Sequence, residues 1–318
     1  MNNRKVVIIG DGNVGSATAF TLMQNEAVNE IVIIDYDKRK AEGDVMDMVH
    51  GMSFVSPKII KAGDYSDCAN AHIIIITAGA RQRDGETRLD LLKRNIGVFD
   101  SIIELMRPYL TLETIVLVVT NPVDILSYYT YKKLNLPSKH VIGSGTVLDT
   151  ARLKFAISED THIDPRSIHT FVLGEHGDSE VAAFSVTSVG GLSINDYCDK
   201  CGVCVDRGSS RLEELHKQVK NAAYEIIQRK GATYYAIALA VNRIVETILN
   251  NQNSILTVSN YVESEFNGLV KDVYFSLPCV VNSDGIDRII EPNYSLDEIS
   301  KLVASAEILR KQIELLEI

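Results

Sequence analysis

Short Val- and Ile-rich runs without polar alternation constrain the fold of this chain more than any other feature. The clearest run holds four isoleucines at 73–76, within a predicted strand at 72–77. Similar runs lie at 5–9, 31–35, 58–62, 114–120 and 140–143. Strands that are buried on both faces have this composition, as in a parallel sheet covered by helices. Helical patterns at 14–25, 38–50, 89–107 and 123–134 separate the runs, so we predict a doubly wound α/β sheet.

The second half of the chain has a different pattern. It predicts strands at 167–173 and 181–189, helices at 210–230 and 233–250, two or three strands between 255 and 281, and a closing helix at 296–316. A chain of 318 residues has room for about two domains. We therefore predict a Rossmann-type domain at 1–145 and an α+β substrate or catalytic domain at 146–318. No flexible linker separates them, so we expect the two domains to share a cleft.

Composition excludes several classes of protein. Hydrophobic residues make up 46% and charged residues 23%, which are values of an ordinary globular chain. The net charge of −10 argues against a nucleic-acid partner. The apolar runs are far shorter than the ~20 residues that span a bilayer. No secretory signal pattern is present at the N-terminus, so we expect a cytoplasmic protein without a membrane partner.

Gly10, Gly12 and Gly15 form a G-x-G-x-x-G pattern between a predicted strand and a predicted helix, the context that a dinucleotide-binding loop requires. The first glycine permits a tight turn, the second lets the backbone approach a pyrophosphate, and the third allows close packing of helix and strand. Asp35 follows Gly15 by 20 residues, where an acid would bind the ribose hydroxyls and repel the 2′-phosphate of NADP. The alternatives are a plain glycine turn and, for Asp35, an N-cap of the helix near Lys38.

Two polar segments follow predicted strands and therefore lie at the edge of the sheet where α/β proteins bind ligands. The segment from Gly79 to Arg88 combines glycines and arginines, which indicates a hinged loop that could meet an anion, or else a solvated charged loop. The segment that starts at Asn121 offers both a donor and an acceptor, although Asn-Pro also begins many turns and helices.

Three further side chains suit acid–base and anion chemistry. Asp149 and Arg152 share a face of a predicted helix, where Arg152 could hold a carboxylate through two hydrogen bonds or simply pair with Asp149. His176 follows a predicted strand between two glycines, where it could transfer protons or serve as a structural histidine.

Cys198, Cys201 and Cys204 have a C-x-x-C-x-x-C spacing, which zinc or an iron–sulfur cluster could use. A fourth ligand at proper spacing is missing, although Cys68, Cys279 or a histidine could supply one through folding. We therefore expect reduced thiols and no metal. The odd number of cysteines, five, also makes a disulfide scaffold a poor interpretation.

Taken in order, these motifs resemble the L-lactate dehydrogenase family, within the larger lactate/malate dehydrogenase group. The resemblance covers essentially the whole chain and rests on segments 10–15, 77–82, 85–91, 121–124, 142–146, 148–152 and 174–178. It implies an NAD-dependent enzyme that reduces pyruvate to L-lactate. It also implies a cytoplasmic homotetramer that acts in glycolysis and fermentation.

The resemblance further implies a role for each site residue. His176 would protonate the keto oxygen, Asp149 would orient the imidazole, and Arg88 would polarise the carbonyl. The residues implied to contact the substrate are Gln82, Arg88, Asn121, Arg152 and Thr233. The residues implied to contact NAD are Gly10, Gly12, Val14, Gly15, Asp35, Lys40, Tyr65, Gly79, Ala80, Arg81, Ser101, Asn121 and Ser144.

Three positions bear on substrate choice and regulation. Malate dehydrogenases of the group carry an arginine where this chain has Gln82, so Gln82 favours pyruvate over oxaloacetate. Malate dehydrogenase is the nearest alternative, and a non-catalytic NAD-binding protein is the alternative from another class.

Relatives activated by fructose 1,6-bisphosphate have an arginine and a histidine at the positions of Lys154 and His169. Lysine lacks the bidentate fork of arginine, so we expect weak or absent activation near pH 7.

Overall fold

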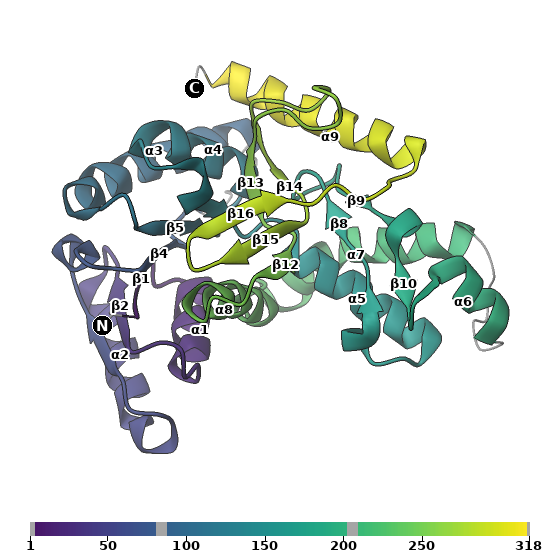
Figure 1. Ribbon diagram of the computed structural model, residues 1–318. Coiled ribbons are helices and arrows are strands. Elements are labelled where there is room, and N and C mark those ends of the chain that lie inside the picture. The colour runs from purple at the N-terminus through teal and green to yellow at the C-terminus, as the bar shows by residue number, and fades with distance from the viewer. Residues whose placement is uncertain (1–3, 81–87, 202–208, 317–318) are drawn as a thin grey trace.

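The structure, a computed structural model, describes residues 4–80, 88–201 and 209–316, and an eight-stranded sheet lies at its centre (Figure 1). The strand order is β14-β13-β6-β5-β4-β1-β2-β3. Its six parallel strands are β1 (Lys5–Ile9), β2 (Glu30–Ile34), β3 (Ile59–Ala62), β4 (Ile73–Ile76), β5 (Ile115–Val118) and β6 (Val141–Gly143). The predicted doubly wound sheet is therefore confirmed, with its strand ends within two residues of the expected positions.

Alternate residues of the central strands feed two separate hydrophobic cores. In β1, Val7 and Ile9 pack into one core, and Val6 and Ile8 pack into the other. The helices α3 (Arg88–Met106) and α4 (Val123–Leu134) cover the first face, and α1 (Asn13–Met23) and α2 (Lys38–His50) contribute to the second (Figure 1). Burial on both faces explains why these strands lack polar positions.

The second half contains α5 (Val147–Thr161), α6 (Ile194–Cys201), α7 (Ser209–Lys230), α8 (Tyr235–Leu249) and α9 (Leu296–Leu315). A three-stranded sheet joins β12 (Ser254–Leu256), β15 (Cys279–Asn282) and β16 (Gly285–Ile289). In Figure 1, α9 crosses the top of the molecule, whereas α5, α6 and α7 lie on its right. Helix α8 packs against α1 of the first half.

Two strands of the second half extend the first sheet, which sequence analysis did not predict. The strands β13 (Ser259–Val262) and β14 (Val273–Ser276) pair antiparallel, and β13 continues the sheet from β6. Ser259 and Asn260 are polar but buried, because each bonds a partner from a distant part of the chain: Ser259 bonds Asp124, and Asn260 bonds the carbonyl of Phe275. The expected strands between 255 and 281 are thus present, but a local hydrophobicity pattern does not show that two of them join the first sheet.

The expected long strands at 167–173 and 181–189 are each divided. The first forms β7 (Ile168–His169) and β8 (Val172–Leu173), which belong to different sheets. The second forms β9 (Val181–Ala182) and β10 (Ser188–Val189), with a 3₁₀ turn at Phe184–Val186 between them. At the two breaks, the buried hydroxyls of Thr170 and Thr187 lie 2.7 Å apart and bond each other.

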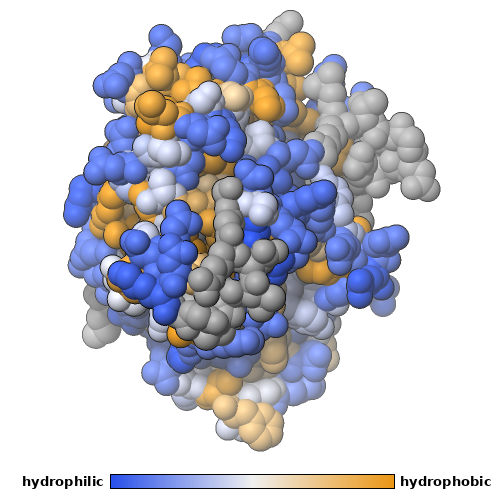
Figure 2. Space-filling view, turned by 90° about the vertical axis from the view of Figure 1, so that its right-hand side faces the viewer, coloured by the Kyte–Doolittle hydropathy of each residue, from blue (hydrophilic) through white to orange (hydrophobic). Residues whose placement is uncertain are grey.

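The surface and the helices are consistent with the composition. On the face drawn in Figure 2, hydrophilic residues predominate and hydrophobic residues form separate groups between them. Within residues 4–80, 88–201 and 209–316, no helix is both long and apolar enough to cross a membrane.

Two glycines offer a matched test of the loop after β1. A Cβ built on Gly15 would lie 1.8 Å from the carbonyl oxygen of Gly10, whereas one built on Gly43 of α2 meets nothing within 4 Å. Gly15→Ala should therefore lower the free energy of unfolding by roughly 1–3 kcal/mol through overpacking. Gly43→Ala should raise it by roughly 0.5–1 kcal/mol, since alanine suits an exposed helix interior better. Urea unfolding of both variants measures the two changes, and a Gly15→Ala protein as stable as wild type would contradict the packing described here.

Candidate active site

The predicted site segments meet at one edge of the sheet because the strands before them are parallel. Gly10 follows β1, Asp35 follows β2, Thr77 follows β4, Thr120 lies just beyond β5 and Ser144 follows β6. The chain reverses its winding direction between β1 and β4, which are neighbours in the sheet. Open α/β sheets bind ligands at this switch point, outside the carboxyl ends of the strands.

The glycine-rich loop has the shape of a phosphate cradle. Gly12 is the N-cap of α1, no side chain caps this helix end, and a Cβ built on Gly12 would meet nothing within 4 Å. The first N–H groups of a helix have no partner within it, and no side chain caps them here, which is an anion-binding arrangement. The hydroxyl of Thr77 donates to the carbonyl of Gly10 at 2.7 Å and holds the loop against β4. These residues fit the pyrophosphate of a dinucleotide.

Asp35 ends β2 beside this cradle. Its Oδ2 accepts a hydrogen bond from the Asp11 backbone N–H at 2.5 Å, and its Oδ1 accepts one from the Asp37 N–H at 2.8 Å. The N-cap of α2 is Asp37, whose side chain accepts from the N–H of Lys40. The alternative in which Asp35 caps this helix is therefore wrong.

A buried asparagine that sequence analysis missed connects two predicted site segments. Asn95 of α3 accepts a hydrogen bond from the Ala80 N–H at 2.7 Å and donates to the Asn121 carbonyl at 3.0 Å. It is 1% exposed. The available signal was a polar residue on the buried face of an amphipathic helix, and its bonds fix Ala80 relative to Asn121.

Asp149 lies between His176 and Arg152 and bonds both. His176 Nδ1 is 2.6 Å from Asp149 Oδ2, and Arg152 Nη1 is 2.7 Å from Asp149 Oδ1. The side chains of Asp149, Arg152 and His176 are 3%, 15% and 25% exposed. The local Asp149–Arg152 ion pair that we considered as an alternative does form, and the same carboxylate also orients the imidazole. Among the described residues none forms a hydrogen bond with Nε2 of His176, so this nitrogen can exchange a proton with a ligand.

The loop that carries His176 is fixed by its main chain. Gly174 exchanges two backbone hydrogen bonds with Ser276 of β14, at 3.0 and 3.1 Å. The N–H of His176 donates to Asp124 Oδ2 at 2.7 Å, and the Ser259 hydroxyl donates to Asp124 Oδ1 at 2.5 Å. Asp124 is buried in the first turn of α4, and sequence analysis gave it no role. It ties the imidazole loop to the nucleotide-binding half.

The charges around His176 favour its protonated form. Burial alone would lower the pKa of His176, but the charge and hydrogen bond of Asp149, with smaller contributions from Asp124 and Glu180, raise it to about 9. Burial opposes ionisation of Asp149, yet His176 and Arg152 together hold the pKa of this carboxyl below its ordinary value. At neutral pH the pair is therefore an imidazolium bonded to a carboxylate.

Glu180 is a second buried carboxyl beside the pair, and sequence analysis did not single it out. One ligand atom from each of Asp149, His176 and Glu180 lies within 4.8 Å of the others, a spacing that could admit a cation. Glu180 Oε1 is 3.4 Å from His216 Nε2 on α7. Burial raises the pKa of Glu180. Arg152 already supplies a positive charge on the other side of Asp149.

The remaining predicted residues are placed as follows. Val14 lies in the first turn of α1, Lys40 in that of α2, and Ser101 is exposed on α3, while Ser144 is buried after β6. Tyr65 begins a 3₁₀ turn after β3, and Thr233 precedes α8. Arg81 and Gln82 lie outside the described residues, and of Arg88 the structure gives only its backbone at the start of α3.

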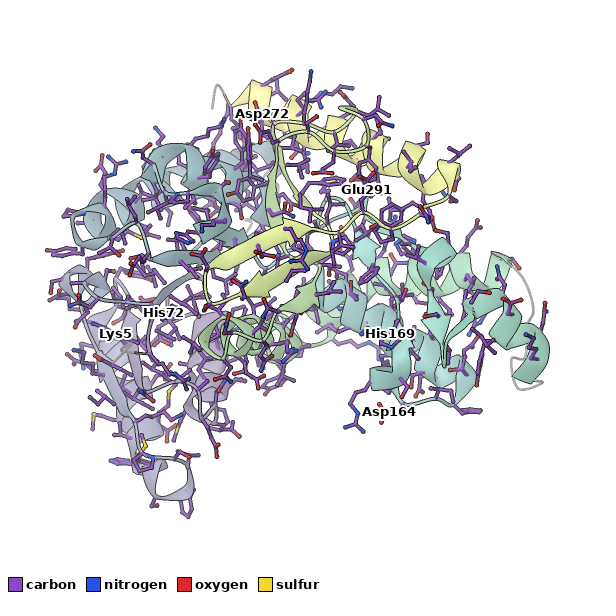
Figure 3. The ribbon with its side chains drawn as sticks, in the orientation of Figure 1. Lys5, His72, Asp164, His169, Asp272 and Glu291 are labelled. Atoms are coloured by element: carbon purple, nitrogen blue, oxygen red, sulfur yellow. The ribbon has the colours of Figure 1, made fainter. Side chains whose placement is uncertain are left out.

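The two predicted effector residues lie on neighbouring elements of the second half. Lys154 is on α5, and His169, which is labelled in Figure 3, is exposed on β7. Burial lowers the pKa of Lys154. The two predicted effector residues thus differ in exposure: the amine of Lys154 is half-buried, and the imidazole of His169 is exposed.

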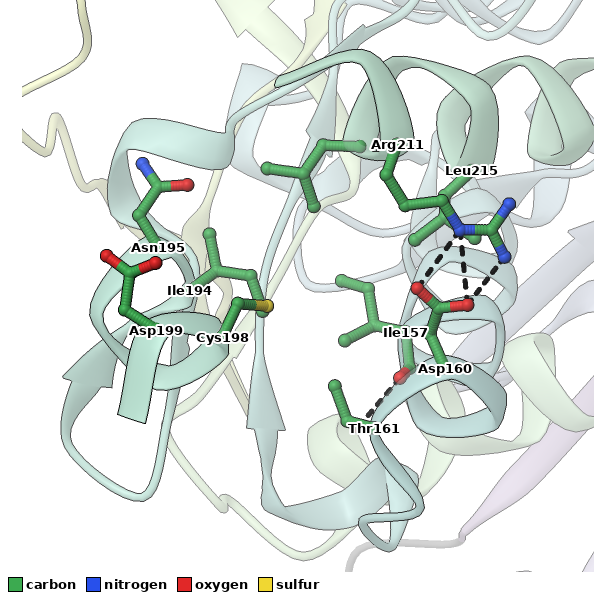
Figure 4. Close-up of a pocket in the computed structure, with 10 residues that line it drawn as sticks. Ile157, Asp160, Thr161, Ile194, Asn195, Cys198, Asp199, Arg211 and Leu215 are labelled. Atoms are coloured by element: carbon green, nitrogen blue, oxygen red, sulfur yellow. Dashed lines mark hydrogen bonds and ion pairs between the residues drawn. The ribbon is translucent and has the colours of Figure 1, made fainter. Parts of the chain in front are cut away.

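The cysteine cluster is only partly described. Cys198 lines a cavity of about 220 Å³ between α5, α6 and α7, together with Ile157, Leu215 and the Arg211–Asp160 ion pair (Figure 4). Asp160 is 11 residues beyond Asp149 on α5, or roughly 16 Å along the helix axis. The side chain of Cys201 and all of Cys204 lie outside the described residues, so the expected absence of a metal stays a prediction there.

Fold and site together define a dinucleotide-binding α/β protein with a hydrogen-bonded Asp149–His176 pair. Two family models match the chain: "lactate/malate dehydrogenase, NAD binding domain" over residues 4–143 and "lactate/malate dehydrogenase, alpha/beta C-terminal domain" over residues 146–317. The chain belongs to the lactate/malate dehydrogenase family, whose members are oxidoreductases that bind NAD.

Individual relatives match over their full lengths. The chain is 50% identical to an L-lactate dehydrogenase of Acetivibrio thermocellus, with 100% of both chains covered. It is 48% identical to L-lactate dehydrogenase 1 of Clostridium acetobutylicum, with 98% of both covered. Among solved structures, a lactate dehydrogenase from a Medee basin deep-sea metagenome library matches with a TM-score of 0.92, 44% identity and 99% coverage of both chains. The minor L-lactate dehydrogenase of Enterococcus mundtii matches with a TM-score of 0.93, 39% identity and the same coverage.

The charge environment of His176 gives a prediction for the protein without ligands. Wild-type His176 should titrate near pH 9, and Glu180→Gln should lower its pKa by roughly 0.5–1 unit because one nearby negative charge is lost. The pH dependence of carbethoxylation of His176, followed by peptide mass spectrometry, measures both values. The exposed Glu159→Gln serves as the control and should leave the pKa unchanged. An unshifted pKa in Glu180→Gln would contradict the contribution of Glu180.

Proposed function

We propose that this protein is an NAD-dependent L-lactate dehydrogenase that interconverts pyruvate and L-lactate in the cytoplasm. The observation that carries the proposal is that one buried carboxylate, that of Asp149, bonds both a proton-transferring imidazole and a guanidinium. A 2-keto acid presents a carbonyl and a carboxylate on adjacent carbons, so it needs a proton donor and a cation side by side. The names of the relatives, L-lactate dehydrogenases at 48–50% identity, support the same activity.

In this proposal His176 is the acid–base group. The reduced cofactor supplies a hydride to the keto carbon, and its oxidised form accepts that hydride in the reverse direction. As the keto oxygen gains negative charge, His176 donates its Nε2 proton to it, so that an alcohol and a neutral imidazole are produced. Asp149 keeps Nδ1 protonated and stabilises the imidazolium before transfer. In lactate oxidation, neutral His176 takes the hydroxyl proton.

Arginines and amides position the substrate. Arg152 would bind the substrate carboxylate through two parallel hydrogen bonds, a geometry for which its planar fork is suited. Its Nη1 is held by Asp149, so the guanidinium and the imidazole keep a fixed separation. By family resemblance, Arg88 polarises the carbonyl, Asn121 contacts substrate and nicotinamide, and Thr233 lines the pocket.

The choice between pyruvate and oxaloacetate depends on the residue that faces the far end of the substrate. Gln82 is neutral, so oxaloacetate would bring its second carboxylate into the site without an ionic partner there. An unpaired desolvated charge costs several kcal/mol. We therefore favour a lactate dehydrogenase over a malate dehydrogenase. A non-catalytic NAD-binding protein would have no need of the intact Asp149, Arg152 and His176 set.

The assembly and the domain division are also proposals. We propose a domain boundary at 145/146, between β6 and α5.

We propose a homotetramer, as the family resemblance implies. The exposed Phe20 of α1, with Tyr235 and Leu239 of α8, supports a surface that another subunit covers. We propose weak or absent activation by fructose 1,6-bisphosphate near pH 7, because Lys154 is partly buried and lacks the bidentate fork of arginine.

A turnover assay with pyruvate and NADH tests the proposal, and Asp149→Asn tests its mechanism. Wild type should oxidise NADH in the presence of pyruvate. In Asp149→Asn the amide cannot stabilise the imidazolium, so kcat should fall by ~10²-fold or more. Calorimetric titration with NADH is the control and should show little change in affinity. A variant within about threefold of wild-type kcat would remove Asp149 from the proposed role, and a wild type inactive with pyruvate would remove the function itself.

Substrate specificity is tested at Gln82. Wild type should favour pyruvate over oxaloacetate by ~10²-fold or more in kcat/KM, since charge-assisted bonds that it cannot make to the second carboxylate are worth roughly 1.5–3 kcal/mol each. Gln82→Arg should reverse much of that preference and leave NADH affinity nearly unchanged. A wild type that prefers oxaloacetate would identify a malate dehydrogenase. An unaltered preference in the variant would exclude Gln82 from substrate discrimination.

A further inference from the structure

A carboxylate is buried inside the glycine-rich loop, where neither the motif nor the family resemblance gave it a role. Asp11 lies between Gly10 and Gly12, and its side chain is 0% exposed. A loop that receives a pyrophosphate gains nothing from a carboxylate in its turn, because like charges repel. The groups around Asp11 must therefore explain why a carboxylate is present at this position.

Asp11 joins two elements at the edge of the nucleotide site. Its backbone N–H donates to Asp35 Oδ2 at 2.5 Å, and its side-chain Oδ2 is 3.0 Å from the ammonium of Lys40. The same ammonium lies 2.7 Å from Asp44 Oδ2, one turn further along α2. Lys40 is thus bonded by one buried carboxylate and one partly exposed carboxylate.

The carboxylates of Asp11 and Asp44 neutralise the ammonium of Lys40 at the place where the 2′-phosphate of NADP would need a cation. Asp35, beside Asp11, is placed to bind the adenosine ribose, so a 2′-phosphate would enter next to Lys40. With all four groups ionised, Asp11, Asp35 and Asp44 with Lys40 carry a formal charge of −2, which repels a phosphate. Burial raises the pKa of Asp11 to about 6 although Lys40 opposes the shift, so Asp11 is mainly ionised at pH 7.5.

We propose that Asp11 is a second determinant of the preference for NAD over NADP, because it neutralises Lys40 and holds it away from a 2′-phosphate. Asp35 repels the phosphate directly, whereas Asp11 removes the charge that could compensate for that repulsion. The inference rests on the proposed nucleotide site but not on pyruvate as the substrate. A purely structural Asp11, which only ties α2 to the loop, is the competing explanation.

Equilibrium binding separates the two explanations. We would titrate the intact enzyme with NADH and with NADPH by calorimetry at pH 7.5, for wild type, Asp11→Asn and the double variant Asp11→Asn/Lys40→Met. Asp11→Asn keeps the size of the side chain and removes its charge. It should strengthen NADPH binding relative to NADH by about fivefold or more, the scale of one freed charge pair at a partly exposed site. The double variant should lose this gain, because the freed ammonium is absent.

Two further proteins serve as controls. Asp44→Asn leaves the buried partner of Lys40 in place, so its NADPH gain should be smaller than that of Asp11→Asn. Lys40→Met alone should lower the NADPH:NADH affinity ratio by less than about twofold, because two carboxylates already neutralise the ammonium and the charge uncovered at this partly exposed site is screened by solvent. This variant keeps the test decisive even if Asp11→Asn does not fold.

Three outcomes would overturn the inference. These are an unchanged ratio in folded Asp11→Asn, a gain that persists in the double variant, and a selective loss of NADPH binding in Lys40→Met. Wild type that binds neither nucleotide would instead contradict the proposed nucleotide site. Wild type that binds NADH but does not reduce pyruvate would contradict the proposed function and leave the role of Asp11 intact.

Discussion

The buried carboxylate of Asp149 is the interaction on which the site depends. A carboxylate that is 3% exposed is stable only when it is paired, and here an imidazole and a guanidinium pair with it from two sides. The pairing fixes the tautomer of His176 and the position of Arg152 together. The rest of the second half can be understood as the framework that brings the loop of His176 to α5. The strands β13 and β14 extend the first sheet, and Ser276 of β14 holds Gly174 by two backbone hydrogen bonds.

Buried polar residues join the nucleotide loop to this pair. Asn95 joins Ala80 to Asn121, and Asp124, three residues beyond Asn121, holds the N–H of His176. A buried carboxylate or amide of this kind is costly unless all its bonds are made. The hydride donor and the proton donor of the proposed reaction would thus be held by one connected set of hydrogen bonds, and the cofactor edge would be shaped by a second set around Asp11, Asp35 and Lys40.

Sequence alone predicted the parts of this structure that local patterns encode. The glycine loop, the unalternated strands and Asp35 after β2 are all specified by spacing within about 30 residues. Asp124 was missed because its partners are remote in the chain; the hydroxyl that bonds it belongs to Ser259, 135 residues away. Asn95 and Glu180 were missed because no motif marks the hydrogen bonds or ion pairs of a single buried polar residue. The pairing of β13 with β6 was also missed, because strands were expected between 255 and 281 but no local pattern shows that Ser259 pairs with Gly143. Asp149 and His176 were recognised through a family resemblance, and only coordinates could place their side chains 2.6 Å apart.

The pH dependence of kcat/KM for pyruvate reduction, compared between wild type and Asp149→Asn from pH 6 to 10, tests the central claim most directly. In the proposed reaction His176 must be protonated, so the rate should fall as pH rises through the pKa of that group. In wild type the fall should centre near pH 9. Without the charge of Asp149, burial would again dominate, and the residual activity of the variant should fall at a pH at least about one unit lower. An identical pH dependence in the two proteins would show that Asp149 does not hold the proton on His176.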